Sequence, residues 1–437
     1  MSRTTPESAP TGSTLESQPD SSADGRSDSV NQDCDWDRDQ DPIEADRSQP
    51  ADAEPSPEET RVLVVSGLAH KNERHYGPLA AAADETTLVC LDPRYAIADA
   101  TYLEVPDVGP RPLRVVLLFF LALLEGYRNE YDAVAAISLF PYGLYALALK
   151  AIYGYPASLG IIGIDLDHHA KQWYGPLPRW AFRRFDAVSV PGPSHVDDLE
   201  GCGVPRNRIE ILANAIDAER FRPDSLDEDI DHDHDHDYDY DYDHDYDYDF
   251  VWVGRFSEEK APVRFVDALI ALENRGDREF RAVMVGDGPL RSEVEKRLES
   301  HGLRERVDLP GWVGDPLAYY RRSPTVVLTS RRDALPLVLL EAMATGLAPI
   351  VPPVGSIPDV VTNGENGIVV PDRDPESFAV AMAHCLDDPD RRRTLGENAT
   401  GIRAAFSYEQ ATRDWERILA TATAGTRGGD SSPFARL

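Results

Sequence analysis

Short runs of apolar, often β-branched residues alternate with longer helical stretches along most of this chain. The first run, RVLVVSG at residues 61–67, is typical of a buried strand that ends at Gly67. Strands without polar alternation are buried on both faces, and helical crossovers between them favour parallel pairing. The sequence therefore predicts an α/β fold built from doubly wound parallel sheets.

The strand–helix rhythm occurs twice, on either side of one low-complexity segment. The first set of predicted strands is 61–66, 87–92, 133–138, 157–163, 187–191 and 209–213. The second set is 250–254, 282–286, 306–309, 325–330, 348–351 and 367–370. Ligands of such sheets bind beyond the carboxyl ends of the strands, so the expected site is a cleft between two Rossmann-like domains.

The segment between the two sets, residues 224–249, alternates Asp with His and Tyr and contains no Lys or Arg. The alternation superficially resembles a strand, but repulsion between the carboxylates predicts an extended, solvated linker. Loose binding of a divalent metal by its Asp-His part is the alternative.

The domain boundaries follow from these patterns and from the polar ends of the chain. The prediction is a disordered acidic tail at 1–58, an N-terminal domain at 59–223, the linker at 224–249, a C-terminal domain at 250–405, a C-terminal helix at 406–424 that crosses back to the N-terminal domain, and a disordered tail at 425–437.

The charge balance limits the classes of partner. The chain has 77 Asp and Glu against 44 Lys and Arg, a formal net charge of -33. Because phosphate backbones require a basic face, no nucleic-acid partner is expected. The acid enrichment with few Lys indicates a salt-adapted, halophilic host, and high-GC coding is the alternative reason for the preference of Arg over Lys. Four dispersed cysteines and a polar start without a signal-peptide pattern predict a cytoplasmic protein.

The longest apolar run is VVLLFFLALL at residues 115–124, which is too short to span a bilayer. We expect a buried helix of the first domain. A patch that rests on the inner membrane surface, giving peripheral membrane contact, is the alternative.

Two cations follow the first strand of the second set. Gly254 ends that strand, and Arg255 and Lys260 lie in the loop before the next helix. Cations at a strand's carboxyl end beside a helix N-terminus suit a diphosphate group. Two solvated loop charges are the alternative.

The stretch DALPLVLLEAMATG, residues 333–346, places a carboxylate in an apolar helix. Pro336 suits the first helical position, and the free N–H groups of Leu337 and Val338 could bind phosphate oxygens. Glu341 lies little more than one turn further on, where the vicinal hydroxyls of a ribose could satisfy it. Asp333 would lie near the other end of a sugar nucleotide. Pairing of Glu341 with a neighbouring Arg is the alternative.

Together these motifs resemble the retaining family-4 glycosyltransferases of the GT-B fold. The resemblance rests on Gly254-Arg255, Lys260, VGDGPL, LPGWV, ALPLVLLEAMATG, PPVGSIPDVV and NGENGIVV, and extends over residues 61–420. It implies an enzyme of the hexosyltransferase type that moves a sugar from a nucleotide-diphosphate sugar to a glycan, lipid-linked or small-molecule acceptor. It also implies retention of configuration, no metal and no other cofactor.

The resemblance also implies a role for each matched residue. Arg255 and Lys260 would neutralise the diphosphate, Glu341 would hold the ribose and Asp333 would contact the sugar ring. The backbone at Trp312 and Val313 would lie beside the base. Gly67 would approach the phosphates from the first domain.

The sequence departs from the family pattern at three places. Asp333 is one methylene shorter than the usual Glu, Ala334 replaces the usual Gly, and Ile162 stands where many members have a histidine. His168 or His169 could substitute for that histidine, or could be polar loop residues. Asp165 and Asp167 form a DxD pattern, but a metal role is rejected because a second complete βα domain follows.

Two other functions fit parts of the pattern. One is a nucleotide-sugar epimerase on the same fold, and the other is a non-catalytic sugar-nucleotide-binding partner subunit. The second alternative is favoured by the departures at Asp333, Ala334 and Ile162. The presence of Arg255, Lys260 and Glu341 argues against it, because a protein without catalysis has little need for all three. No oligomeric state is predicted.

Overall fold

The computed structural model describes residues 60–67, 72–91, 97–161, 166, 173–223, 246–276 and 278–425. All of these lie in one unit, Pro57–Leu437. Several predictions fall outside the described residues. They are the tail at 1–58, all but the last four residues of the insert at 224–249, all but the first residue of the tail at 425–437, and Ile162, Asp165, Asp167, His168 and His169.

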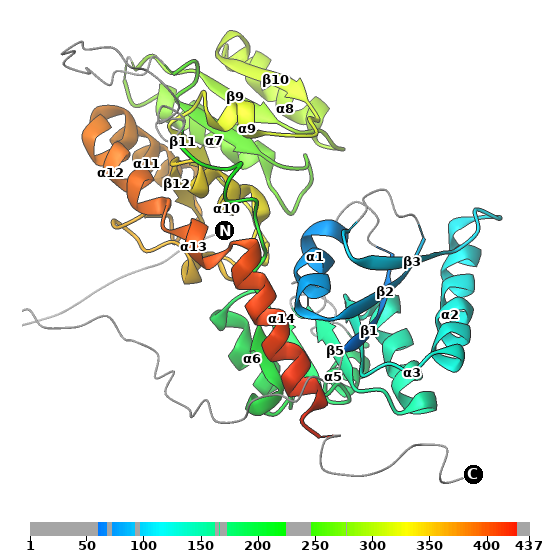
Figure 1. Cartoon of the computed structure of the whole chain (residues 1–437). Coiled ribbons are helices and arrows are strands. Elements are labelled where there is room, and N and C mark those ends of the chain that lie inside the picture. Colours follow the sequence, from blue (N-terminus) through cyan, green and yellow to red (C-terminus); the bar gives the residue numbers. More distant parts are fainter. Residues whose placement is uncertain are drawn as a thin grey trace, which may run out of the picture. The chain divides into compact units, whose positions relative to one another are not determined.

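Within the described residues, the first sheet has seven parallel strands in the order β3-β2-β1-β4-β5-β6-β7 (Figure 1). They are β1 (Arg61–Ser66), β2 (Glu85–Cys90), β3 (Ala100–Glu104), β4 (Ala133–Ile137), β5 (Ala157–Gly160), β6 (Ala187–Val190) and β7 (Ile209–Ile211). Its helices are α1 (Asn72–Ala82), α2 (Arg111–Arg128), α3 (Leu144–Tyr153), α5 (Pro176–Phe182) and α6 (Val196–Gly201).

Among residues 246–276 and 278–425, the second sheet has six parallel strands in the order β10-β9-β8-β11-β12-β13. They are β8 (Phe250–Val253), β9 (Ala282–Val285), β10 (Val307–Gly311), β11 (Thr325–Val327), β12 (Ala348–Val351) and β13 (Ile368–Val369). The helices of this part are α7 (Pro262–Glu273), α8 (Arg291–Ser300), α9 (Leu317–Tyr320), α10 (Leu337–Ala344), α11 (Pro375–Asp387), α12 (Pro389–Ala399), α13 (Ile402–Ala405) and α14 (Tyr408–Thr423).

The two sheets confirm the predicted doubly wound α/β fold. Each has a switch point where the strand order reverses, between β1 and β4 in the first sheet and between β8 and β11 in the second. Crevices at such points, beyond the carboxyl ends of the strands, are where ligands of open α/β sheets bind. The fold therefore directs attention to the loops after β8 and β11.

The sequence pattern missed one strand, β3. Its residues, ATYLE, are only partly buried and contain no continuous apolar run. Because β3 is the outermost strand of the first sheet, it is covered less than its neighbours. The buried-strand pattern that identified the other strands is therefore absent from it.

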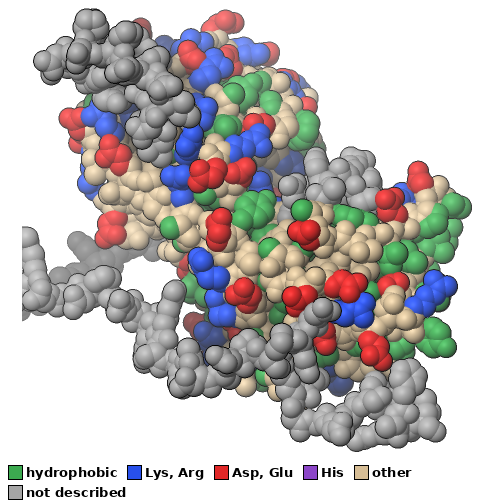
Figure 2. All heavy atoms as spheres, viewed as in Figure 1, with side chains coloured by type: hydrophobic (Ala, Val, Ile, Leu, Met, Phe, Trp, Pro, Cys, Tyr) green, Lys and Arg blue, Asp and Glu red, His purple; other side chains and the backbone are tan. Residues whose placement is uncertain are grey.

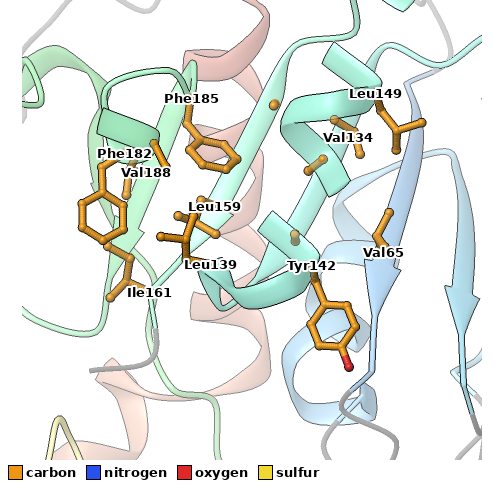
Figure 3. Close-up of a cluster of buried hydrophobic side chains, with 14 of the residues drawn as sticks. Val65, Val134, Leu139, Tyr142, Leu149, Leu159, Ile161, Phe182, Phe185 and Val188 are labelled. Carbon is orange, nitrogen blue, oxygen red and sulfur yellow. The ribbon is translucent and has the colours of Figure 1, made fainter. Parts of the chain in front are cut away.

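The first sheet packs its core against helices that follow β4 and β5. Figure 3 shows side chains from the strands, such as Val65, Val134, Leu159 and Val188, meeting Leu149, Phe182 and Phe185. A second cluster on the other face includes Val62, Ala187, Trp415 and Ile418. The sheet is thus covered on both sides, as continuous apolar strands require.

Helix α14 belongs to the covering of the first sheet, although it follows the second in sequence. Trp415 Nε1 donates to the carbonyl of His75 at 3.2 Å, and Asp414 Oδ2 accepts from the N–H of Ala213 at 2.9 Å. The chain therefore returns to its N-terminal domain at its C-terminal helix (Figure 1).

The expectation of a buried helix at residues 115–124 is wrong in part. This run lies in α2, and Val116, Phe120 and Leu124 are exposed. Hydrophobic side chains gather where α2 lies, at the right edge of the view in Figure 2. A helix that is apolar all round needs cover on all sides, but the sheet covers only one stripe of α2. No helix among the described residues is long and apolar enough to cross a bilayer.

Candidate functional site

A cavity of about 780 Å³ opens at the carboxyl ends of β8, β9 and β10 and at the start of α10. Its wall includes backbone and side chains of the second domain, together with Arg74 of α1 and Tyr408 of α14. Seven of the ten residues predicted from the sequence line it: Gly254, Arg255, Trp312, Val313, Leu337, Val338 and Glu341. The lining does not include Gly67, Lys260 or Asp333.

Helix α10 presents its N-terminus to this cavity. Pro336 has extended backbone and caps the helix, so the helix begins one residue later than predicted, at Leu337. The first helical hydrogen bonds run from the N–H of Leu339 to the carbonyl of Pro336, at 3.0 Å. The N–H groups of Leu337 and Val338 precede this ladder and carry the positive end of the helix dipole.

Glu341 is 6% exposed and lies against Arg74. Arg74 Nη1 is 3.1 Å from Glu341 Oε1, so the alternative in which an arginine satisfies this carboxylate is the one seen here. Burial raises the pKa of Glu341, and the charge of Arg74 and its hydrogen bond oppose that rise. Burial raises the pKa of the fully buried Tyr320 well above its usual value, and the negative charge of Glu341 adds to that rise.

Arg74 is one of the site residues that the sequence did not identify; Asp217, Arg220, Asp287, Asp315 and Tyr408 also line the cavity without having been predicted. Arg74 lies in the charged stretch NERHYG that opens α1, far from the motifs of the second domain. Only the folded chain shows that its arginine reaches the helix that carries Glu341.

Lys260 and Asp333 form an ion pair with each other. Ser330 Oγ also donates to Asp333 Oδ2, at 3.2 Å. The two residues were assigned to different parts of a ligand, one to the diphosphate and one to the sugar. The structure joins them as one polar unit with Ser330, which lies in the loop after β11 because that strand ends at Val327, three residues earlier than predicted.

A glycine in the loop after β12 holds this unit in place. Gly355 has a φ of +55°, and a Cβ there would overlap the carbonyl oxygens of Asp333 and Ala334. Ser356 donates its N–H to the Ala334 carbonyl at 2.6 Å. The loop after β12 therefore fixes the backbone that carries Asp333.

Two further glycines shape the strand ends beneath the cavity. Gly286 and Gly288 have φ values of +139° and +157°, and side chains there would collide with the carbonyls of Gly254 and Phe256. Both glycines belong to the VGDGPL stretch at residues 285–290. The close neighbour seen is the turn after β8, which carries Arg255.

The cavity is rich in charge. Arg255 is exposed within it, and no ion pair of Arg255 is found in the described part of the chain. Arg220 pairs with Asp315, while Asp217 and Asp287 add two more carboxylates. Trp312 is 78% exposed and provides an aromatic surface at the rim. The arrangement suits a ligand with a planar ring, hydroxyl groups and an anionic end.

Gly67 has a different setting from the one expected. A Cβ on Gly67 would overlap the hydroxyl of Tyr142, which follows β4. A glycine is therefore required at the end of β1 to admit this tyrosine at the switch point of the first sheet. Its predicted approach to phosphates stays a prediction.

Loops from the two sheets also meet directly. His195 Nδ1 lies 2.7 Å from Ser356 Oγ, and Asp359 Oδ2 accepts the N–H of Ser194 at 3.1 Å. These contacts connect the loop after β6 with the loop that holds Asp333. Among the described residues, no group of three or more His, Cys, Asp or Glu side chains is placed to hold a metal.

Two protein-family models match the chain. The model described as Glycosyltransferase Family 4 matches residues 78–220, and the one described as Glycosyl transferases group 1 matches residues 243–401. The second match contains every residue of the cavity wall between Val253 and Glu341.

Relatives of known function match part of the chain. The alpha-D-kanosaminyltransferase of Streptomyces kanamyceticus is 34% identical over 157 residues, which is 36% of this chain and 40% of the relative. A Campylobacter jejuni alpha-1,4-N-acetyl-D-galactosaminyltransferase, named for a diNAcBac-PP-undecaprenol-linked glycan, is 27% identical over 171 residues, 39% of this chain and 47% of the relative. The chain thus spans less than half the length of these relatives.

Solved structures match nearly the whole chain. HepE of Anabaena, in complex with UDP, superposes with a TM-score of 0.64 and 16% identity over 87% of this chain and 100% of HepE. Its complex with UDP-glucose gives the same TM-score over 84% of this chain and 99% of HepE. At this identity the likeness shows the fold, which is the GT-B arrangement of two Rossmann-like domains.

Proposed function

Because this chain belongs to the family-4 glycosyltransferases, we propose that it moves a sugar from a nucleotide-diphosphate sugar to an acceptor. The cavity at the strand ends of the second sheet carries the proposal. It combines an exposed cation, a helix N-terminus and a buried carboxylate, which are the groups that a diphosphate joined to a ribose would require. The UDP complexes of HepE support a uridine nucleotide as the first donor to test.

The leaving diphosphate would be stabilised by Arg255 and by the N–H groups of Leu337 and Val338. These groups are fixed by the turn after β8 and by the start of α10, so little reorganisation would accompany the growth of negative charge. Lys260 would add a second cation once Asp333 exchanges that ion pair for a hydroxyl of the sugar.

Glu341 would accept the ribose hydroxyls while keeping its contact with Arg74. Arg74 Nη1 contacts one carboxylate oxygen, Oε1, at 3.1 Å. The cation would lower the cost of keeping Glu341 ionised in its buried position. An ionised carboxylate accepts hydrogen bonds from both hydroxyls, whereas a protonated one would have to donate one.

The transfer would proceed with retention and without a metal or other cofactor. The diphosphate oxygen would take the proton of the acceptor on the face of the sugar that it leaves. Charge stabilisation would come from Arg255, Lys260 and α10. The proposed acceptor is a glycan or lipid-linked sugar, by analogy with the Campylobacter relative, and the proposed location is the cytoplasm of a halophilic host at the inner membrane surface.

The deciding experiment is incubation of the full chain with a panel of nucleotide sugars and acceptors at high salt, followed by separation of the products. A new glycoside together with free nucleoside diphosphate supports the proposal. An isomerised donor formed without acceptor indicates an epimerase instead. Donor-dependent thermal stabilisation with no turnover on any acceptor indicates a binding subunit.

A further inference from the structure

Helix α2 carries an exposed apolar stripe along its whole length. The exposed side chains are Leu113, Val116, Phe120, Leu124 and Tyr127. They recur every three or four residues, so they lie on one line at about 3.6 residues per turn. The residues that α2 buries are Leu118, Ala122 and Gly126, which lie on the opposite side of the helix. Phe120 is 59% exposed and Tyr127 is 72% exposed, although both are large apolar groups.

The neighbouring helices extend this surface. Helix α1 connects β1 to β2, toward one edge of the sheet, whereas α2, α3 and α5 lie in connections that run toward the other edge. Because such connections are right-handed, α2, α3 and α5 lie on one side of the first sheet and α1 lies on the opposite side. Tyr153 of α3 donates to the Leu123 carbonyl of α2, at 2.8 Å, which joins two of these helices. We define the α2–α3–α5 face as the α2 stripe together with exposed Ile152 of α3 and exposed Leu177 and Trp180 of α5.

Exposed apolar groups are concentrated on this face. In the described part of the chain, twelve large hydrophobic side chains are exposed, and eight of them belong to the α2–α3–α5 face. Isolated exposed apolar residues are ordinary, whereas a contiguous patch marks an interaction surface.

The same helices are basic in an otherwise acidic chain. The ranges 111–128, 144–153 and 176–184 contain seven cations and one acid, Glu125. Arg114 pairs with Asp107 at 2.9 Å, and Lys150 pairs with Asp186 at 2.6 Å. The other five cations are exposed: Arg111, Arg128, Arg179, Arg183 and Arg184. The formal charge of the whole chain is -33, so the excess of cations in these three ranges is local and does not reflect a basic composition of the chain.

From these observations we infer that the α2–α3–α5 face docks on an anionic lipid bilayer. A bilayer offers negative headgroups above an apolar interior, which matches exposed Leu, Phe, Tyr and Trp beside Arg. Arg184 stacks over the Trp180 ring, with its guanidinium 4.9 Å from the centroid, an amphipathic pair suited to the headgroup level. A second copy of the chain fits less well, because a self-complementary interface would bring the same cations together.

This inference goes beyond the proposed sugar transfer, since no residue of the face lines the cavity. It can therefore be tested without donor or acceptor. The full chain is mixed with vesicles of phosphatidylcholine alone or of phosphatidylcholine with phosphatidylglycerol, and bound protein is separated by flotation. The variants are Phe120→Ser/Leu124→Ser and Arg179→Glu/Arg183→Glu. Tyr246→Ser, which changes an exposed aromatic outside the face, is the matched control.

The wild-type chain and Tyr246→Ser should float with phosphatidylglycerol vesicles. Phe120→Ser/Leu124→Ser should bind at least about tenfold more weakly at any salt concentration. Arg179→Glu/Arg183→Glu should lose about tenfold at low salt and less at high salt, because headgroup attraction is screened. Unchanged melting temperatures show that these variants fold. A blue shift of tryptophan emission on vesicle binding, reduced in Trp180→Phe, should report insertion at the face.

Three results would overturn the inference. One is wild-type protein that does not float with either vesicle, and another is equal binding by the Phe120→Ser/Leu124→Ser and Tyr246→Ser variants. The third is a dimer of the wild type that Phe120→Ser/Leu124→Ser converts to a monomer, which would assign the face to a second copy. Vesicle binding by a chain that transfers no sugar would contradict the proposed function and leave the docking surface intact.

Discussion

Arg74 Nη1 lies 3.1 Å from Glu341 Oε1, joining the first helix of the N-terminal domain to the helix that opens into the cavity of the second. The buried carboxylate that the sequence suggested for a ribose is therefore already held by a cation. Each partner depends on the other, because an unpaired charge in this position would lose the solvation that bulk water gives it.

The first prediction concerns this pair. Arg74→Ala should lower the free energy of unfolding by about 1–3 kcal/mol, since it leaves the carboxylate of Glu341 buried without its partner. Urea denaturation of the wild type and variant measures the loss. In a Glu341→Gln background the same change should cost less, because the neutral amide needs no cation. Equal losses in both backgrounds would show that the pair contributes nothing.

A second prediction concerns pH. Burial raises the pKa of Glu341 above its usual 4.5, so the folded chain holds this proton at a higher pH than the unfolded chain. This stronger proton binding increases the free energy of unfolding fully at a pH below 4.5, and the increase is lost as the pH rises through the pKa of Glu341 in the folded state. The stability of the wild type relative to Glu341→Gln should therefore fall as the pH rises from 4.5. Urea unfolding of both proteins at constant salt tests this. A free energy of unfolding of the wild type that rises with pH relative to that of Glu341→Gln would contradict the prediction.

Arg255 should be needed for the chemistry and not for folding. Arg255→Ala should reduce kcat by about 10²–10³-fold, and Lys260→Ala should have a similar effect, because both would stabilise the leaving diphosphate. Turnover and melting temperature should be measured together. Arg275→Ala, which removes an exposed cation after α7, is the control and should keep full activity. Near-wild-type turnover in either site variant would refute its role.

Asp333 should affect the sugar rather than the nucleotide. Asp333→Asn should lower kcat/KM for the nucleotide sugar while leaving the Kd of the free nucleoside diphosphate unchanged, because the proposed contact of Asp333 is with a hydroxyl of the sugar and not with the diphosphate. Calorimetry and steady-state kinetics separate the two effects. A weaker nucleoside diphosphate complex would instead place Asp333, through its pair with Lys260, in phosphate binding.

The last prediction concerns metal independence. Transfer should be unchanged by EDTA, because the proposed charge stabilisation comes from Arg255, Lys260 and the start of α10. Activity that disappears with chelator and returns with a divalent cation would require a metal. Fold integrity under chelator, checked by circular dichroism, distinguishes that outcome from unfolding.

Local patterns in the sequence predicted most of the strands. The run at 61–66 and the run at 348–351 match β1 and β12 residue for residue, because continuous apolar strands in a doubly wound sheet are recognisable without knowledge of their neighbours. The edge strand β3 was missed for the converse reason. Its partial burial depends on its place beside β2, which a local pattern does not encode.

The candidate site divides in the same way. Gly254, Arg255 and the start of α10 follow strand ends in sequence, so the alternation of strands and helices predicted that they would converge. The pair of Lys260 with Asp333 depends on how the turns after β8 and β11 bring side chains into contact, which spacing along the chain does not fix. The two residues were thus identified but their relationship was not.

By itself, the sequence determined the two parallel sheets, their covering by helices and the strand ends where a ligand could bind, because hydrophobic periodicity and turn residues act over a few positions. Tertiary structure alone decided that Arg74 meets Glu341, that Lys260 pairs with Asp333 and that one side of α2 stays uncovered. Each of these depends on which distant surfaces pack together, and burial energy depends on that packing rather than on composition.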